Sequence, residues 1–313
     1  MTGGAGFIGS HLVDALLERG AKVRVLDDLS SGRRENLAGV LSRIEFLEGD
    51  IRDAELCRRA CEGAVFVFHQ AARGSVPRSM SDPATTIAIN VAGTANVFAA
   101  AREAKVGRVI YASSSSVYGD SLTLPKREGE EGKPLSPYAA SKAVNEQLAD
   151  VFARCFGMQF VGLRYFNVYG PRQDPDGPYA AVIPRFFKAC LAGEAPVIYG
   201  DGEQSRDFTY VSDAVAANLA AAEAPESECG RAYNVAGGRR TTVNELARLV
   251  REASGSGLAA DHVALRSGDI PHSLADLGRV RASLGWMPRM ELPEGLAMAK
   301  AHYRAAVREA ARR

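Results

Sequence analysis

The chain has 313 residues, with 38 Lys and Arg against 37 Asp and Glu, and a formal net charge of +1. This length exceeds the usual single-core size, so we expect two coupled lobes. The balanced charge argues against nucleic acid or an acidic membrane surface as a partner. The five cysteines form neither a CxxC nor a Cys/His cluster, so we expect reduced thiols and no metal site. A secretion signal and an apolar run near 18 residues are both missing, which predicts a cytoplasmic protein without a membrane span.

The first half of the chain alternates short apolar runs with amphipathic helical patterns. This alternation is typical of βαβ units that build a doubly wound parallel sheet, an α/β fold. We expect helices at about 10–19, 53–61, 84–104 and 138–156. We expect strands at 23–26, 44–47, 65–68, 109–112 and 160–163. Residues 120–136, rich in Gly, Glu, Lys and Pro, predict a surface loop.

The pattern becomes irregular from about residue 167, where Gly, Pro and Asp cluster, before helical stretches at about 182–192 and 212–223. We therefore expect a smaller C-terminal α/β lobe that binds substrate. We assign residues 1–166, with about 208–236, to the first domain. We assign residues 167–207 and 237–313 to the second.

A glycine-rich turn opens the chain and points to a dinucleotide. Gly3, Gly6 and Gly9 precede a helical pattern, so backbone N–H groups can reach a pyrophosphate at the positive end of a helix. Asp27 follows the next strand, where a carboxylate can accept both ribose hydroxyls. A helix cap plus an ordinary surface Asp is the alternative. Asp27 favours NAD over NADP, although Arg33 and Arg34 lie close enough to keep NADP open. No Gly-Lys-Ser/Thr follows, which excludes a P-loop.

The strand that normally precedes such a turn is not seen, because only Met1 and Thr2 stand before Gly3. That strand is central in a doubly wound sheet, and its loss would cost more than a typical stability of about 5 to 15 kcal/mol allows. We therefore expect the natural chain to begin several residues earlier. The alternative is a chain that folds with a gap and binds NAD weakly.

A second pattern points to catalysis. Tyr138 and Lys142 stand four residues apart after Pro137 and so share one helix face. A neighbouring ammonium and the positive nicotinamide would both favour phenolate. An ordinary surface pair is the alternative. The strand at 109–112 ends in the serine run 113–116, which places hydroxyls at the carboxyl edge of the sheet, where ligands of such folds bind.

Together these motifs resemble the extended short-chain dehydrogenase/reductases, of the NAD-dependent epimerase/dehydratase group with its Rossmann-type fold. Within this group the sequence is most similar to UDP-sugar 4-epimerases, and above all to bacterial UDP-N-acetylglucosamine 4-epimerases. The resemblance covers essentially the whole chain. It is carried by the TGxxGxxG turn, the Ser run before VYG, YxxxK, and residues 49–51, 69–72, 74–79, 163–170, 179–184 and 200–208.

The resemblance implies roles for individual residues. Tyr138 would be the base that takes the O4 proton while hydride leaves C4 for the nicotinamide. Lys142 would hold the cofactor ribose and lower the Tyr138 pKa, and Ser114 would hydrogen-bond O4. The 4-keto sugar would then turn over and take the hydride back on its other face.

The implied binding residues fall into two sets. Those for NAD, besides Tyr138 and Lys142, are Gly3, Gly6, Phe7, Ile8, Gly9, Asp27, Asp28, Ser31, Gly32, Asp50, Ile51, Gln70, Ala71, Ala72, Asn90 and Phe166. Those for the UDP-sugar are Gly74, Ser75, Ser114, Tyr138, Asn167, Ala181, Val182, Tyr199, Arg206, Arg266, Asp269 and Ser273. For Arg206 and Arg266 a surface ion pair is the alternative.

Other chemistries share this fold. Related 4,6-dehydratases and decarboxylases carry a Glu before the VYG-like triplet, whereas Ser115 and Ser116 stand here, which favours simple epimerisation. An idle NAD-binding sensor would have lost the tyrosine and lysine. Restricted UDP-glucose epimerases carry a Tyr seven residues after the UDP-binding Arg, where this chain has Ser273, so an N-acetyl group should fit and a smaller sugar is not excluded. The oxidation state of C6 stays open.

The resemblance also implies a homodimer, packed through the long helices at about 84–104 and 138–156. Small residues on the first helix would allow close approach, although they could equally pack on the sheet. These residues are Ala92, Gly93, Ala95, Ala99, Ala100 and Ala101.

Overall fold

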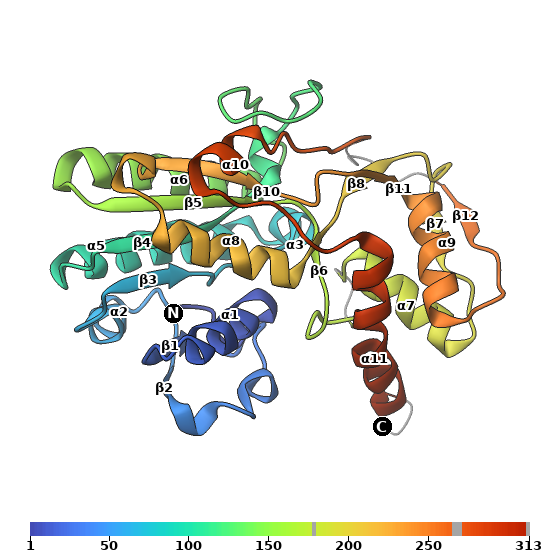
Figure 1. The fold of residues 1–313 in the computed structure, drawn as a ribbon, viewed down its shortest axis with the longest axis horizontal. Coiled ribbons are helices and arrows are strands. Elements are labelled where there is room, and N and C mark those ends of the chain that lie inside the picture. The colour runs from blue at the N-terminus through green and yellow to red at the C-terminus, as the bar shows by residue number, and fades with distance from the viewer. Residues whose placement is uncertain (177–179, 265–270, 311–313) are drawn as a thin grey trace.

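The computed structural model describes residues 1–176, 180–264 and 271–310. Its main body is a parallel sheet with helices on both faces (Figure 1). The strands are β1 (Val23–Asp27), β2 (Ile44–Glu48), β3 (Phe66–His69), β4 (Arg108–Ser114), β5 (Gln159–Tyr165) and β10 (Arg231–Val235). The predicted strands are all present. β10 was not predicted.

The strand order runs β2-β1, then β3-β4-β5-β10, and every pairing is parallel. Met1 and Thr2 lie between β1 and β3, because Thr2 bridges both Leu26 and His69. The Thr2 N–H donates to Phe68 O, and the Leu26 N–H donates to Met1 O. These two residues thus bridge β1 and β3 where the chain enters the glycine turn, but they form isolated bridges and not a strand.

Amphipathic helices cover the two faces of this sheet. On one face lie α1 (Phe7–Glu18) and α8 (Val211–Glu223), with α10 (Gly278–Leu284) at the β10 edge. On the other lie α2 (Ala54–Cys61), α5 (Thr94–Glu103) and α6 (Pro137–Phe156). The short helices α3 (Val76–Ser81) and α4 (Pro83–Ile87) pack against α6. Single 3-10 turns span Arg34–Leu37, Leu41–Arg43, Ser115–Tyr118 and Glu226–Glu228.

The helix predicted at 84–104 is interrupted. It consists of α4, a π-helical turn over Ala88–Gly93, and α5. Such turns shift the register of a helix and are frequent at functional sites. The stretch Pro83–Glu103 is long and apolar enough to pass for a membrane span, but Val97 and Phe98 within it are fully buried in the core below the sheet. Its apolar character is therefore explained by packing.

A smaller lobe gathers beside the sheet (Figure 1). Its helices are α7 (Val182–Ala192), α9 (Val243–Ser254) and α11 (Leu292–Ala310). Its short strands form three pairs, namely β6 (Val168–Tyr169) with β9 (Thr209–Tyr210), β8 (Ser205–Asp207) with β11 (Arg240–Thr242), and β7 (Val197–Tyr199) with β12 (Asp261–Val263). One hydrophobic core joins the three helices, and Phe208 and Tyr210 contribute to it as well. Phe208 and Tyr210 therefore belong to the core of the smaller lobe. They also lead directly into α8, which covers the main sheet.

All five cysteines are free thiols. No cluster of His, Cys, Asp and Glu suited to a metal occurs within the described ranges.

Candidate active site

The glycine turn is packed so tightly that two of its positions exclude a side chain. Gly3 has a φ of +70°, and a Cβ on it would lie 2.6 Å from Ala71 N. A Cβ on Gly9 would lie 2.0 Å from Gly3 O. At Gly6 a Cβ would meet only Gly3 O, at 3.2 Å, and Gly6 is the N-cap residue of α1. The unbonded N–H groups of this helix end are therefore open to an anion.

Asp27 stands at the end of β1 with its carboxylate turned toward this turn. It accepts hydrogen bonds from Ala5 N (2.8 Å) and Leu29 N (2.9 Å). Burial raises the pKa of Asp27, and these two backbone bonds oppose the rise. A Cβ on Gly32 would lie 2.8 Å from Asp27 Oδ1, so the turn after Asp27 closes directly over the carboxylate. The sequence predicts that a ribose binds at this carboxylate.

Two arginines near Asp27 could have bound the 2′-phosphate of NADP, but both form ion pairs with carboxylates. Arg33 forms an ion pair with Asp174 at 2.8 Å. Arg34 pairs with Glu48 at 2.5 Å and lies over the Phe46 ring. Both ion pairs are half exposed and weak as stabilising contacts. Because both guanidinium groups are already paired with carboxylates, they are less available to bind a 2′-phosphate, which favours NAD.

Three further residues predicted to contact NAD are held by polar partners within the chain. Asn90 is fully buried in the π-helical turn, where it accepts from Arg73 N (2.8 Å) and donates to Ser141 Oγ (3.0 Å). Gln70 donates to Tyr165 Oη and Asn218 Oδ1. Asp50 is bound by Arg52, whose side chain lowers the Asp50 pKa.

Tyr138, Lys142 and Ser114 are brought together by two elements. Ser136 caps α6 by accepting from Ala139 N, which places Tyr138 in the first turn and Lys142 one turn later. Ser114 ends β4, and its side chain lies near enough to the Tyr138 phenol to lower the pKa of that group. The Lys142 ammonium lies 6.0 Å from the centre of the Tyr138 ring. The predicted trio is therefore a single site at the carboxyl edge of the sheet.

The protonation of this trio is governed by burial. Burial raises the pKa of Tyr138, and the Ser114 side chain opposes the rise. Burial lowers the pKa of Lys142 to about 8, while the nearby carboxylate of Glu146 raises it. In the structure Ser114 lowers the pKa of Tyr138. Lys142 donates a hydrogen bond to Ala112 O at 2.7 Å, and its expected effect on the Tyr138 pKa stays a prediction.

The residues expected to contact the UDP-sugar lie mainly around β8. Arg206 donates to Ser205 O at 2.9 Å, and Ser273 N donates to the same oxygen at 3.0 Å. Tyr199 ends β7, with the Arg185 guanidinium 5.5 Å from its ring centre. Asn167 has a φ of +32° and donates to Asp207 O.

The other expected substrate residues lie at helix starts or outside the described part of the chain. Ser75 caps α3 by accepting from Arg78 N, and Gly74 precedes it. Ala181 and Val182 begin α7. Arg266 and Asp269 lie outside the described residues, so their predicted contacts with UDP stay predictions.

One prediction about the surroundings of the site was only partly right. Residues 120–136 form a mostly exposed loop, as expected, but Lys126 and Glu128 within it are buried. Glu131 pairs with the buried Arg164, which also binds Glu146 at 2.6 Å. The polar composition of this segment does not predict these contacts, because each of them joins residues that are far apart in the sequence.

Comparison with known proteins identifies the chain's family. The model of the NAD dependent epimerase/dehydratase family matches residues 1–236. The chain belongs to this family.

Individual relatives extend over nearly the full length. The UDP-glucose 4-epimerase of Mycolicibacterium smegmatis is 41% identical over 301 residues, which cover 95% of each chain. The structure of the UDP-N-acetylglucosamine 4-epimerase from Methanobrevibacter ruminantium, in complex with UDP-N-acetylmuramic acid, superposes with a TM-score of 0.93 at 40% identity, covering 97% of each chain. A UDP-N-acetyl-alpha-D-glucosaminuronate decarboxylase of Bacillus cytotoxicus is 35% identical over 313 residues and 95% of each chain.

The cofactor of this NAD-dependent epimerase/dehydratase family fits the residues present. The close backbone packing at Gly3 and Gly9 fixes the turn that leads into α1, whose N-terminal N–H groups can bind a pyrophosphate. The buried Asp27 carboxylate supplies the acceptor for a ribose. NAD held between these groups and the Tyr138 helix would accept and return a hydride.

Proposed function

We propose that this member of the family is a UDP-sugar 4-epimerase. It interconverts UDP-GlcNAc with UDP-GalNAc, and UDP-Glc with UDP-Gal, without net oxidation. The observation that carries the proposal is the Ser114–Tyr138–Lys142 site, flanked by hydroxyls at Ser115 and Ser116. The relatives named as 4-epimerases support it.

Three residues carry the chemistry in this proposal. Tyr138 acts as a phenolate that takes the proton from the sugar O4, becomes a neutral phenol, and gives the proton back when the hydride returns to C4. Ser114, which lowers the pKa of Tyr138, orients the O4 hydroxyl beside it. Lys142 is fixed to β4 through Ala112 O, and its positive charge stabilises the phenolate before the proton is taken.

Binding is divided between the two parts of the molecule. We assign NAD to residues 1–166 with about 208–236, and the UDP-sugar to residues 167–207 and 237–313. Arg206 and Arg266 are the proposed diphosphate ligands, since a guanidinium can donate two parallel hydrogen bonds to phosphate oxygens. We propose that Ser273 limits the size of the group that the site accepts at the sugar C2.

A lyase is the competing function, because one close relative is named a decarboxylase. Removing water or carbon dioxide from the sugar calls for a further acid or base beside Tyr138. Ser115 and Ser116 offer hydroxyls there, so the side chains favour epimerisation.

The test is incubation of purified protein with UDP-GlcNAc and, separately, with UDP-Glc, followed by separation of the products. Epimers at C4 with unchanged mass are expected from both. Loss of water from either sugar, or loss of carbon dioxide from UDP-N-acetylglucosaminuronate incubated in parallel, would assign a lyase. Unchanged substrate, with NAD bound, would assign a sensor.

A further inference from the structure

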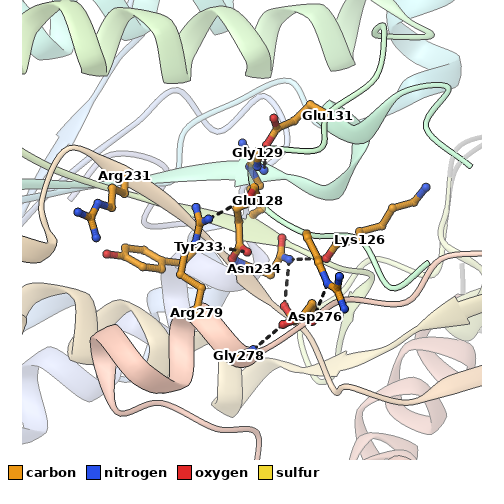
Figure 2. Close-up of polar contacts among 12 residues, drawn as sticks. Lys126, Glu128, Gly129, Glu131, Arg231, Tyr233, Asn234, Asp276, Gly278 and Arg279 are labelled. Atoms are coloured by element: carbon orange, nitrogen blue, oxygen red, sulfur yellow. Dashed lines mark hydrogen bonds and ion pairs between the residues drawn. The ribbon is translucent and has the colours of Figure 1, made fainter. Parts of the chain in front are cut away.

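Asn234 is a buried residue whose side-chain hydrogen-bonding groups are all used, and these bonds join distant segments of the chain. It lies in β10 with no exposed surface. Its amide nitrogen donates to Lys126 O at 2.9 Å and to Asp276 O at 3.1 Å (Figure 2). Its Oδ1 accepts from the Tyr118 hydroxyl at 2.7 Å. Both amide protons and the amide oxygen are therefore used.

The two segments that meet on Asn234 are also joined to each other. Lys126 N donates to Leu274 O at 2.7 Å, and Asp276 N donates back to Lys126 O at 2.9 Å. Glu128 strengthens the same junction, because its carboxylate accepts from Asn234 N at 2.8 Å. The two segments, residues 126–128 and 274–276, thus form one hydrogen-bonded unit, which the buried Asn234 side chain holds in place.

A second buried group holds the same unit from the other side. Asp207 has no exposed surface and accepts from Ala275 N at 3.1 Å. Directly before this unit, Ser273 is bound to Ser205 O at the start of β8. The position of Ser273 is therefore set by β8 on one side and by Asn234, through residues 274–276, on the other.

The third contact of Asn234 leads to the proposed catalytic side chains. Tyr118 ends the 3-10 turn Ser115–Tyr118, which Ser114 caps by accepting from Ser116 N. Asn234 therefore links the turn that carries Ser114 to the segment that carries Ser273. Because the two amide protons and the amide oxygen point to different segments, only one arrangement satisfies all three bonds.

We propose that Asn234 is a positioning residue that sets the separation between the Ser114 turn and the Ser273 segment, and so the width of the sugar pocket. This inference rests on the proposed function, in which both segments contact the sugar. Asn234 itself touches neither sugar nor cofactor. Its effect falls on binding and on the choice between sugars.

The principal test compares Asn234→Ala with a matched control, Asp213→Ala. Asp213 is also buried and also binds the backbone of a distant segment, at Arg289 N and Met290 N, but it does not contact the unit. We expect Asn234→Ala to raise KM for both UDP-sugars at least about tenfold, with a smaller change in kcat, and to alter the ratio of kcat/KM between them. Asp213→Ala should lower Tm and leave KM within about twofold. Unchanged KM and sugar ratio in Asn234→Ala would overturn the proposal.

A second readout does not depend on turnover. Hydrogen exchange of the Lys126 and Asp276 amides should become faster in Asn234→Ala than in Asp213→Ala, and calorimetry should show weaker binding of UDP-GlcNAc. If the wild-type protein epimerises neither sugar, the proposed function fails, while exchange rates and UDP-GlcNAc affinity still decide this inference. Equal exchange in both variants would contradict it.

A milder variant covers the case in which Asn234→Ala does not fold. Tyr118→Phe keeps the ring and removes one bond to Asn234. We expect a smaller rise in KM in the same direction, together with faster exchange at residues 274–276. Wild-type values for both measurements would refute the positioning role.

Discussion

Lys142 Nζ donates a 2.7 Å hydrogen bond to the backbone oxygen of Ala112, and this bond fastens α6 to β4 one turn beyond Tyr138. Because Ser114 ends the same strand, the bond also fixes the distance between the phenol and the serine hydroxyl.

Tyr138→Phe and Lys142→Ala should each reduce turnover by about a hundredfold or more, the range typical of a lost general acid or base. The fold should survive in both, which circular dichroism and bound NAD per chain would check. Turnover of UDP-GlcNAc is the measurement. Full activity in Tyr138→Phe would exclude it as the base.

Ser273→Tyr should largely abolish turnover of UDP-GlcNAc and spare UDP-Glc. The added ring would meet an acetamido group at C2 but not a hydroxyl. Separate kcat/KM values for the two sugars provide the measurement, and Ser273→Ala is the matched control without added bulk. An equal loss on both sugars would show that Ser273 is not the limit.

Asp27→Ala should weaken NAD binding by about tenfold to a hundredfold, since hydrogen bonds to a charged group contribute about 1.5 to 3 kcal/mol. Titration calorimetry of cofactor-free protein would measure the affinity. Asp176→Ala is the control, because that carboxylate forms only a surface ion pair with Lys188. Equal affinity in both variants would place the ribose elsewhere.

Stability should depend on pH through Asp207. Burial raises the pKa of Asp207 to about 6 from 3.8, while backbone N–H groups of Ala275 and of residues 237–239 oppose the rise. Between these values the folded chain keeps a proton that the unfolded chain has lost. The contribution of Asp207 to stability therefore decreases as pH rises from about 4 to 6, by an amount of about 3 kcal/mol.

Asp207→Asn removes this titration. Denaturant unfolding at several pH values should show the variant gaining stability relative to wild type as pH rises through this window. Parallel curves for the two proteins would argue that Asp207 does not titrate there.

A homodimer remains a prediction. Several small residues expected at its interface are used inside the chain, since Gly93 packs on Ile51 and Ala100 and Ala101 lie in the core. Val151 and Phe156 on α6 are exposed. Sedimentation at micromolar concentration should give twice the chain mass of 33.3 kDa, and Val151→Asp should give the monomer. A monomeric wild-type protein would refute the prediction.

Elements and motifs that depend only on neighbouring residues could be predicted from the sequence alone. Apolar periodicity located β1 to β5 and most helices of the main sheet, because burial of one face imposes that period on neighbouring residues. Glycine spacing in the turn, and the four-residue step from Tyr138 to Lys142, likewise express the geometry of a few consecutive residues. Local rules are enough for such features.

Contacts between residues that are far apart in the chain could be seen only in the folded structure. Asn234 contacts Lys126 and Tyr118, which lie more than 100 residues away, and no sequence period links them. Glu128 looked like one charge in a polar loop, yet it is buried because β10 supplies a backbone donor. Whether a polar side chain is exposed or joins two segments depends on partners that only folding brings close, so its own neighbours in sequence carry no signal of it.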